Sequence, residues 1–284
     1  MPQLLEKLNN KQLLWILSGV LALGVVLLIL LLCLKPERQP PVTEATELAI
    51  TEPSFLEVNP FRPEDFVTDD QGFVHCLTAD CRLGIDVSGF QGQINWEQVR
   101  SAGVEFVFIR VGGRGTSQGS LYTDDYAQQY YQGAKKAGLA VGAYFFSQSI
   151  TPAEAQEEAM FVLKQIQDWD LDLPVVYDWE WVSDTARTAD LSGFQLTHCT
   201  EAFCQIIKNA GLTPMVYFNY SQGMQMLNLN RLSKYPLWLA LYHPYPDFPY
   251  RVDYWQYSCT GRIPGIEVDV DLNLFMTAPT ENLS

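Results

Sequence analysis

Two carboxylates lie one residue apart at the end of an apolar segment. Residues 173–177 read Leu-Pro-Val-Val-Tyr, which predicts a buried strand, and Asp178, Trp179 and Glu180 follow directly. Alternate side chains of a strand face the same way, so we expect Asp178 and Glu180 on one side of the sheet. When two carboxyl groups are held close together, one pKa rises enough to keep a proton near neutral pH while the other group stays ionised. This pair can break a glycosidic bond, because the acid protonates the departing oxygen and the carboxylate faces the developing positive charge.

The rest of the chain predicts the elements that position these acids. Apolar segments alternate with helical patterns, which are clearest at residues 96–102, 124–137, 151–167 and 194–210. Apolar segments separated by helices indicate parallel strands. Eight of them predict an α/β fold, an irregular (β/α) TIM-like barrel in which some helices are short or missing. We expect its strands at residues 83–87, 106–111, 139–146, 173–177, 215–219, 237–242, 254–257 and 268–272.

Active sites of such barrels lie at the C-terminal ends of the strands, which tests the assignment. Asp86 lies near the end of the first strand, and Asp271 lies on the eighth, which a closed barrel places beside the first. We therefore expect Asp86 and Asp271 beside the catalytic pair, where they bind substrate hydroxyls, tune the charge of the pair or bind the backbone. Six further residues near strand ends are candidates for sugar contact, with barrel core or rim as the alternative: Tyr144, Tyr217, Asn219, Tyr242, Trp255 and Gln256.

Composition excludes several other functions. The formal net charge is −15 and no basic stripe occurs, which argues against nucleic acid as a partner. The histidines, His75, His198 and His243, are not at metal-ligand spacing, so neither a zinc site nor a Ser-His-Asp triad is expected. The sequence has no phosphate-binding loop or dinucleotide fingerprint, and we expect neither a metal nor another cofactor. Arg110 is expected to pair with an acid, with contact to a substrate carboxylate as the alternative.

Several segments, in this order, resemble the glycoside hydrolase family 25 muramidases. They are Gly84–Gly92 with Ile94–Trp96, Phe106–Arg110, Gly142–Phe146, Pro174–Glu180, Trp255–Ser258, Gly261–Ile266 and Val270–Asn273. The resemblance implies an irregular (β/α) barrel and hydrolysis of the β-1,4 bond between N-acetylmuramic acid and N-acetylglucosamine in peptidoglycan. It also implies that Glu180 is the general acid, that Asp178 is its partner carboxylate, and that Asp86 and Asp271 complete the site. The chain departs from the common pattern at the bulky Trp181 and between Asp184 and Leu191.

Two other functions remain open. One is a membrane-tethered peptidoglycan-binding module that has lost turnover, although a binding module has no need of Glu180. The other is a barrel hydrolase of chitin-like chains, whose usual signature has a longer run of spaced acids than residues 175–177 provide. A wall-clearing assay with chitin oligomers in parallel distinguishes the three functions. The expected partners are peptidoglycan glycan strands and the membrane, and the sequence identifies no protein partner.

Residues 13–34 carry no charge and are long enough to cross a bilayer as an uncleaved anchor. We expect a cytoplasmic tail at residues 1–12, a linker rich in proline and acids at residues 35–80, and the barrel domain at residues 81–284. In the linker, Phe61, Phe66 and Phe73 are expected to dock on the barrel. Basic residues are nearly balanced across the span, so orientation follows from the substrate: a single-pass protein of the inner (cytoplasmic) membrane, with its catalytic domain on the periplasmic or extracytoplasmic side.

The cysteines do not settle the redox state of the domain. Cys76 and Cys81 bracket a short loop and are candidates for a disulfide in an oxidising compartment. Cys199 and Cys204 are five residues apart on an expected helix and do not share one face, and Cys259 is left over. The connectivity stays open, as does a fully reduced domain.

Overall fold

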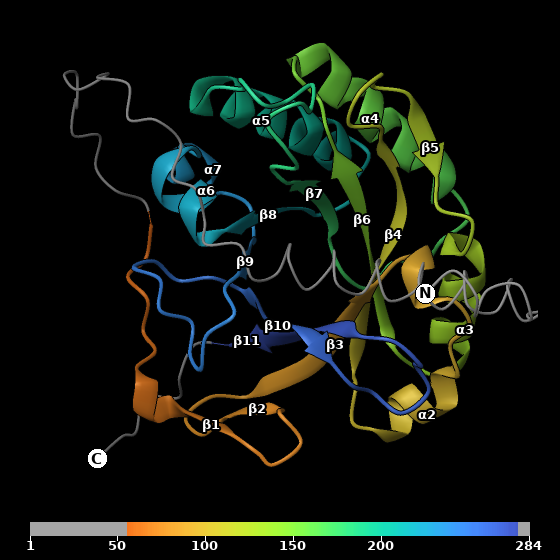
Figure 1. Cartoon of the computed structure of the whole chain (residues 1–284), viewed down its shortest axis with the longest axis vertical. Helices are drawn as coiled ribbons and strands as arrows, with labels where there is room; N and C mark the ends of the chain where they lie inside the picture. Colours follow the sequence, from red (N-terminus) through yellow and green to blue (C-terminus); the bar gives the residue numbers. More distant parts are fainter. Residues whose placement is uncertain (1–55, 278–284) are drawn as a thin grey trace, which may run out of the picture. The chain divides into compact units, whose positions relative to one another are not determined.

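The strands of the domain close into a barrel. The computed structural model describes residues 56–277, in which nine strands form one sheet in the order β3-β11-β10-β9-β8-β7-β6-β4-β5, and pairing of β3 with β4 closes the ring (Figure 1). The eight barrel strands are β3 (Cys81–Val87), β4 (Phe106–Arg114), β6 (Ala140–Ser147), β7 (Val175–Trp179), β8 (Pro214–Asn219), β9 (Leu237–Ala240), β10 (Tyr254–Gly261) and β11 (Val270–Met276). β5 (Leu121–Thr123) extends β4 as a hairpin. The predicted eight-stranded barrel is confirmed.

The last strand runs against its neighbours. β3 to β10 pair in parallel around the ring, whereas β11 is antiparallel to both β10 and β3. The prediction of parallel strands was therefore wrong for this one, because residues 262–269 are too few for a crossover helix. As a result, the beginning of β11, and with it Asp271, lies at the same end of the barrel as the C-terminal ends of the other strands.

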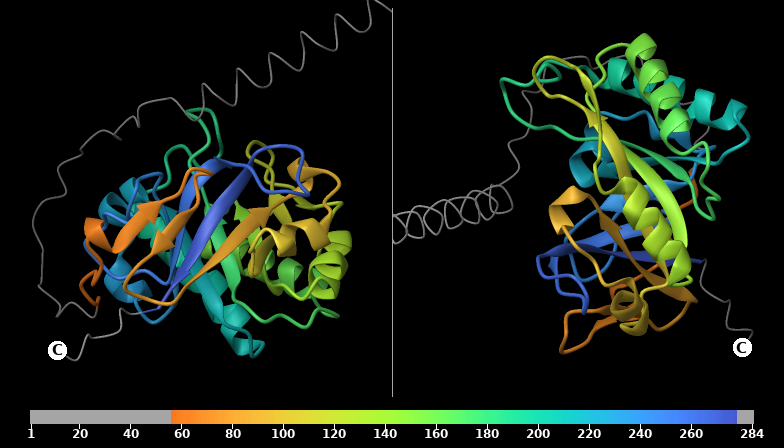
Figure 2. Two further views of the ribbon diagram at one scale, coloured as in Figure 1. Left: turned by 90° about the horizontal axis from the view of Figure 1, so that it is seen from below. Right: turned by 90° about the vertical axis from the view of Figure 1, so that its right-hand side faces the viewer.

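The expected helices lie outside the barrel. The structure has α2 (Trp96–Ser101), α3 (Ala127–Lys136), α4 (Pro152–Gln165) and α5 (Gly193–Asn209), followed by the short α6 (Tyr220–Gln225) and α7 (Leu229–Leu232). The predicted start of α4 is confirmed: the Thr151 side chain accepts a hydrogen bond from the Glu154 amide, and Pro152 occupies the first turn. In the views of Figures 1 and 2, α4 and α5 pack side by side along one wall of the barrel.

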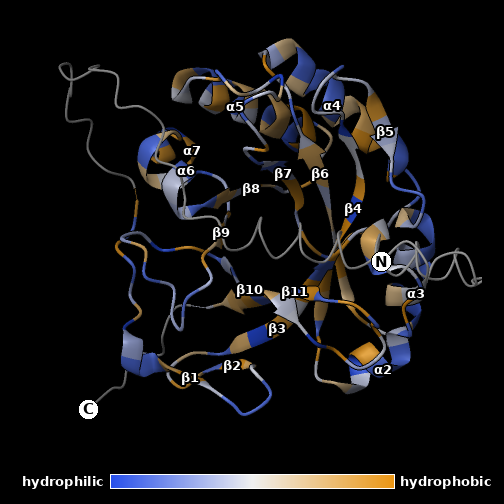
Figure 3. Cartoon of the chain, viewed as in Figure 1, coloured by the Kyte–Doolittle hydropathy of each residue, from blue (hydrophilic) through white to orange (hydrophobic). Residues whose placement is uncertain are grey.

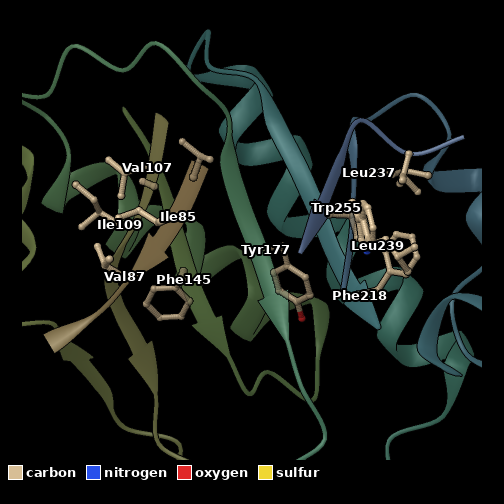
Figure 4. Packing of buried hydrophobic residues seen from close by; sticks show 14 of the residues in the cluster. Ile85, Val87, Val107, Ile109, Phe145, Tyr177, Phe218, Leu237, Leu239 and Trp255 are labelled. Atoms are coloured by element: carbon tan, nitrogen blue, oxygen red, sulfur yellow. The ribbon is translucent and has the colours of Figure 1, made fainter. Parts of the chain in front are cut away.

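Strand side chains alternate between the inside and the outside of the barrel. In β4, Phe106 and Phe108 belong to the cluster that fills the interior, whereas Val107 and Ile109 belong to the larger cluster beneath the helices (Figure 4). The Phe108 ring stacks on Trp238 at a centroid distance of 4.8 Å. Gly84 makes room for this filling, since a Cβ there would lie 2.2 Å from the Phe106 ring. Hydropathy mapped on the cartoon shows apolar residues along β4, β6 and β7 and a mixture of polar and apolar residues along the helices α4 and α5 (Figure 3).

The segment before the barrel is packed against it. Residues 56–80 include a 3-10 turn, η2 (Pro63–Asp65), and a hairpin of β1 (Phe66–Thr68) and β2 (Val74–Cys76). Phe61 and Phe66 are buried, the Phe66 ring meets Trp255 edge-on at 5.5 Å, and Phe73 packs against the same core. Docking of these aromatics is thus confirmed. The linker boundary at residue 80 is corrected, because residues 56–80 carry enough apolar surface to fold onto the barrel.

The remaining N-terminal predictions lie outside the described residues. These are the cytoplasmic tail at residues 1–12, the anchor at residues 13–34 and the linker from 35 to 55. Within residues 56–277, none of the helices has the length and apolar character needed to cross a bilayer.

Candidate active site

A pocket of about 450 Å³ opens at the end of the barrel where the parallel strands terminate. Eight of the ten predicted site residues line it: Asp86, Tyr144, Asp178, Glu180, Tyr217, Tyr242, Gln256 and Asp271. They come from six barrel strands and from the residues that follow β7 and β9. The barrel therefore brings together acids that are far apart in the sequence, and the pocket is large enough for a sugar ring with its substituents.

Asp178 and Glu180 occupy different depths of this pocket. Asp178 is the fourth residue of β7 and is 5% exposed, whereas Glu180 follows the strand and is exposed at the pocket mouth. Both line the cavity, as the alternation of strand side chains requires. Asp178 Oδ1 is buried without a hydrogen-bond partner in the described protein. An acceptor buried in this way is costly unless a ligand supplies the missing donor.

Asp86 is held by buried amides. Its Oδ2 accepts hydrogen bonds from Gln256 Nε2 and from Asn273 Nδ2, both at 2.8 Å. Gln256 Oε1 in turn accepts from the hydroxyls of Tyr217 at 2.9 Å and Tyr242 at 3.2 Å. This network fixes the inner wall of the pocket and turns the Gln256 amide so that its nitrogen faces Asp86.

All four acids of the pocket bind protons more tightly than free carboxyl groups. Burial raises the pKa of Asp86 to about 6, although the hydrogen bonds from Asn273 and Gln256 oppose the rise. Although part of the Glu180 side chain is exposed, the protein atoms that crowd its carboxyl exclude water and, followed by the charge of Asp86, raise its pKa to about 7. The pKa of Asp178 is raised well above its ordinary value by burial and then by the charge of Glu180, and that of Asp271 by burial and then by Asp86.

The sequence predicted that one pKa of the catalytic pair rises while the other group stays ionised, whereas burial and neighbouring charges raise the pKa values of both groups. The acids repel one another in a poorly solvated pocket, so they titrate as a group rather than as one acid and one base. The group retains protons at neutral pH, and Glu180 is the member placed at the mouth.

Two predicted site residues do not line the pocket. Asn219 caps α6, where its Oδ1 accepts a hydrogen bond from the Gln222 amide at 2.9 Å. Trp255 is fully buried on the outer side of the wall, and its Nε1 donates to the Leu241 carbonyl at 2.8 Å. The cause is the strand alternation: Tyr254 and Gln256 face the interior, so Trp255 faces outward (Figure 4).

Six lining residues were not predicted as sugar contacts: Ser88, Phe90, Gln91, Tyr122, Phe146 and Trp238. Arg110 also lines the pocket. Arg110 pairs with an acid as expected; its partner is Asp124, at 2.8 Å. Phe90 is 79% exposed and lies over the Arg110 guanidinium at 5.1 Å. Ser88, Phe90 and Gln91 directly follow the first strand, so the barrel rule itself was a signal for them. Tyr122 comes from the β5 hairpin, which no pattern predicted.

Comparisons with known proteins agree with this geometry. The model of the family "Glycosyl hydrolases family 25" matches residues 85–266. The chain is 31% identical over 202 residues to "Lysozyme M1" of Streptomyces globisporus, with 68% of this chain and 67% of the relative covered. It is 30% identical to "Autolytic lysozyme" of Clostridium acetobutylicum, covering 68% of this chain but only 55% of that relative. The structure of a family GH25 lysozyme from Aspergillus fumigatus matches with a TM-score of 0.58 and 28% identity, over 72% of this chain and 97% of that one.

Proposed function

Because the chain belongs to glycosyl hydrolases family 25 and is a glycosidase, we propose that it is a muramidase. Its substrate in this proposal is peptidoglycan, cut at the β-1,4 bond between N-acetylmuramic acid and N-acetylglucosamine. The observation that carries the proposal is the pocket in which Glu180 lies at the mouth, with Asp86, Asp178 and Asp271 below it. The names of the relatives, both lysozymes, support the same substrate.

Glu180 supplies the proton in this mechanism. Its carboxyl, with a pKa of about 7, is largely protonated in mildly acidic solution and still partly protonated at neutral pH. It transfers the proton to the glycosidic oxygen as the bond from that oxygen to the anomeric carbon breaks. The leaving sugar departs with a new hydroxyl group, and the positive charge on the anomeric carbon develops above the acids of the pocket.

Asp178 assists the sugar that remains bound. Its unpartnered Oδ1 matches the N–H of an N-acetyl group, which would orient the acetamido carbonyl toward the anomeric carbon. The carbonyl oxygen then closes a ring on that carbon, water opens it, and the Glu180 carboxylate takes the proton of the water. An alternative route has Asp178 act directly on water or on carbon, and the same residues serve both routes.

The other lining residues bind substrate. Asp86, fixed by Gln256 and Asn273, can accept a hydrogen bond from a sugar hydroxyl, and Tyr144, Tyr217 and Tyr242 present aromatic edges and hydroxyls to the ring. Asp271 contributes through its contact with Asp86. Asn219 and Trp255 support the wall of the pocket and do not contact the glycan in this proposal.

Mass analysis of the fragments released from purified wall material tests this function. The proposal expects fragments whose reducing end is N-acetylmuramic acid, and no release of chitin oligomers assayed in parallel. Fragments that end in reducing N-acetylglucosamine, or cleavage of chitin oligomers alone, would contradict it. Binding to walls without any release would favour the non-catalytic module.

We also propose that the uncharged segment at residues 13–34 anchors the enzyme in the inner membrane, with the barrel on the wall side. The argument is the sequence of the segment together with the location of the substrate. The test fuses to the C-terminus a reporter enzyme that works only outside the cytoplasm, and we expect this reporter to be active. A reporter active only in the cytoplasm would overturn the orientation.

A further inference from the structure

The residue that carries the proposed acid lies just beyond the end of its strand. β7 ends at Trp179, whose last partner on β6 is Ser147, so Glu180 lies past the ladder of backbone hydrogen bonds. Buried glutamine side chains continue the ladder. Gln148 Nε2 donates to the carbonyl oxygens of Ser147 and Glu180, both at 2.9 Å, and thereby bridges the two strands.

Gln222 does the same from the other side of β7. Its Nε2 donates to the Trp179 carbonyl at 3.2 Å, while its Oε1 accepts from the Asn219 amide at 2.8 Å. The two backbone carbonyls that end the catalytic segment are therefore held by amide side chains from both neighbouring strand ends. Both glutamines are buried, so solvent cannot replace the lost hydrogen bonds cheaply.

The orientation of the Gln148 amide is fixed by residues of the following loop. Thr188, which is 1% exposed, donates from its hydroxyl to Gln148 Oε1 at 2.8 Å. This bond forces Nε2 toward Glu180. The Arg187 guanidinium donates to the Gln148 carbonyl and forms an ion pair with Glu154 of α4 at 2.6 Å. Both residues lie between Asp184 and Leu191, the stretch in which the chain departs from the family pattern it resembles.

We propose that Gln148 is a positioning residue for Glu180: fastened by Thr188 and Arg187, its amide holds the backbone that carries the acid at the pocket mouth. The inference rests on the role proposed above for Glu180. Displacing the Glu180 carboxyl leaves substrate binding unchanged, but the carboxyl then no longer reaches the glycosidic oxygen. A misplacement of about 1 Å can lower the rate on the order of a hundredfold. The loss should therefore fall on kcat and leave KM unchanged.

The test compares hydroxyl deletions in the full chain. Thr188→Val removes the hydroxyl that orients Gln148, Thr188→Ser keeps it, and Thr200→Val removes an equally buried hydroxyl that bonds within α5, to the Leu196 carbonyl. We expect Thr188→Val to lower kcat on soluble wall fragments roughly tenfold with KM unchanged. Thr188→Ser should recover most of the rate, and Thr200→Val should match the parent.

The inference is overturned if Thr188→Val turns over like Thr200→Val, or if its loss appears in KM alone. Should Thr188→Val fail to fold, Gln148→Asn serves instead, because it keeps the amide but shortens its reach to the Glu180 carbonyl; unchanged kcat there has the same meaning. Glu180→Gln distinguishes a failure of the proposed function from a failure of the positioning role. If that variant remains active, the proposed function fails; if it is inactive while Thr188→Val is normal, only the positioning role fails.

Discussion

Asp86 and Asp271 stand directly opposite each other across the antiparallel pair of β3 and β11, and both line the pocket. Burial raises the pKa of both groups, that of Asp86 to about 6 and that of Asp271 well above its ordinary value. Gln256 and Asn273 donate hydrogen bonds to Asp86 Oδ2 and thereby stabilise its ionised form, whereas the charge of Asp86 raises the pKa of Asp271.

Neutral substitutes for these two acids should have unequal effects. Asp271→Asn keeps the size of the side chain and can donate a hydrogen bond toward Asp86, so it should lower kcat/KM less than about tenfold. Asp86→Asn removes the charge that the two amides hold, and we expect a loss on the order of a hundredfold. Steady-state kinetics on soluble wall fragments measure both values. Equal losses would contradict the unequal roles expected of the two acids.

The rate should fall as the solution becomes alkaline. Glu180 has a raised pKa of about 7, so the proton it donates is present below that pH and is lost as the pH rises through it. The pH profile of kcat/KM is therefore expected to have its basic limb near pH 7. Because the charge of Asp86 helps to raise this pKa, Asp86→Asn should move the limb to lower pH. A limb that stays in place, or one above pH 9, would argue against Glu180 as the donor.

Asp178→Asn should lower kcat and raise Tm at alkaline pH. The variant replaces the carboxylate proposed for the acetamido group by a neutral amide, whose oxygen is a weaker acceptor and carries no charge, and we expect kcat to fall by roughly a hundredfold or more. The folded-state pKa of Asp178 is raised, so the folded protein holds a proton that the unfolded chain releases, and this stabilisation is lost as the pH increases. The variant avoids that loss. Its Tm should exceed that of the parent by about 2–6 °C at pH 8, with a smaller difference at pH 5.

Thermal unfolding of both proteins across this pH range provides the measurement. A difference in Tm that does not grow with pH would mean that the ionised form of Asp178 does not destabilise the folded protein. The exposed Asp184, in the loop after β7, supplies a matched Asp→Asn control for the general effect of charge removal.

The hairpin before the barrel should contribute to stability and not to turnover. Phe66→Ala removes a buried ring from Trp255 and should lower the free energy of unfolding by about 2–4 kcal/mol, with kcat unchanged. Phe194→Ala, at a position that is 74% exposed, should change it by less than about 0.5 kcal/mol. Urea denaturation measures both. An unchanged free energy of unfolding in Phe66→Ala would mean that residues 56–80 do not unfold cooperatively with the barrel.

Apolar segments were sufficient to predict the barrel, because most residues of its strands are buried, and the capped beginning at Thr151 marked the start of α4. The direction of β11 was missed, although the short connection at residues 262–269 carried that information. The antiparallel direction of β11 does not alter the predicted site. Asp271 lies near the beginning of β11, and this beginning is at the same end of the barrel as the C-terminal ends of the other strands.

The site residues were predicted where strand alternation was respected. Asp178 and Glu180 share a parity and share the pocket, whereas Trp255 and Gln256 are adjacent and cannot both face it. The lining contributed by Tyr122 and the positions of Gln148 and Thr188 depend on how loops fold over the rim, and no local pattern specifies them. The collective rise of the pKa values also required the structure, because it depends on how many acids share one poorly solvated space.

The central claim is that Glu180 donates the proton, and its isosteric amide tests it most directly. Glu180→Gln keeps the size and hydrogen-bonding capacity of the side chain but has no proton to give, so kcat on wall fragments should fall by about a hundredfold to ten-thousandfold. Tm should stay close to that of the parent, and the exposed Glu97→Gln serves as the matched control with normal turnover. A folded Glu180→Gln enzyme that releases the same fragments at nearly the parent rate would contradict the account.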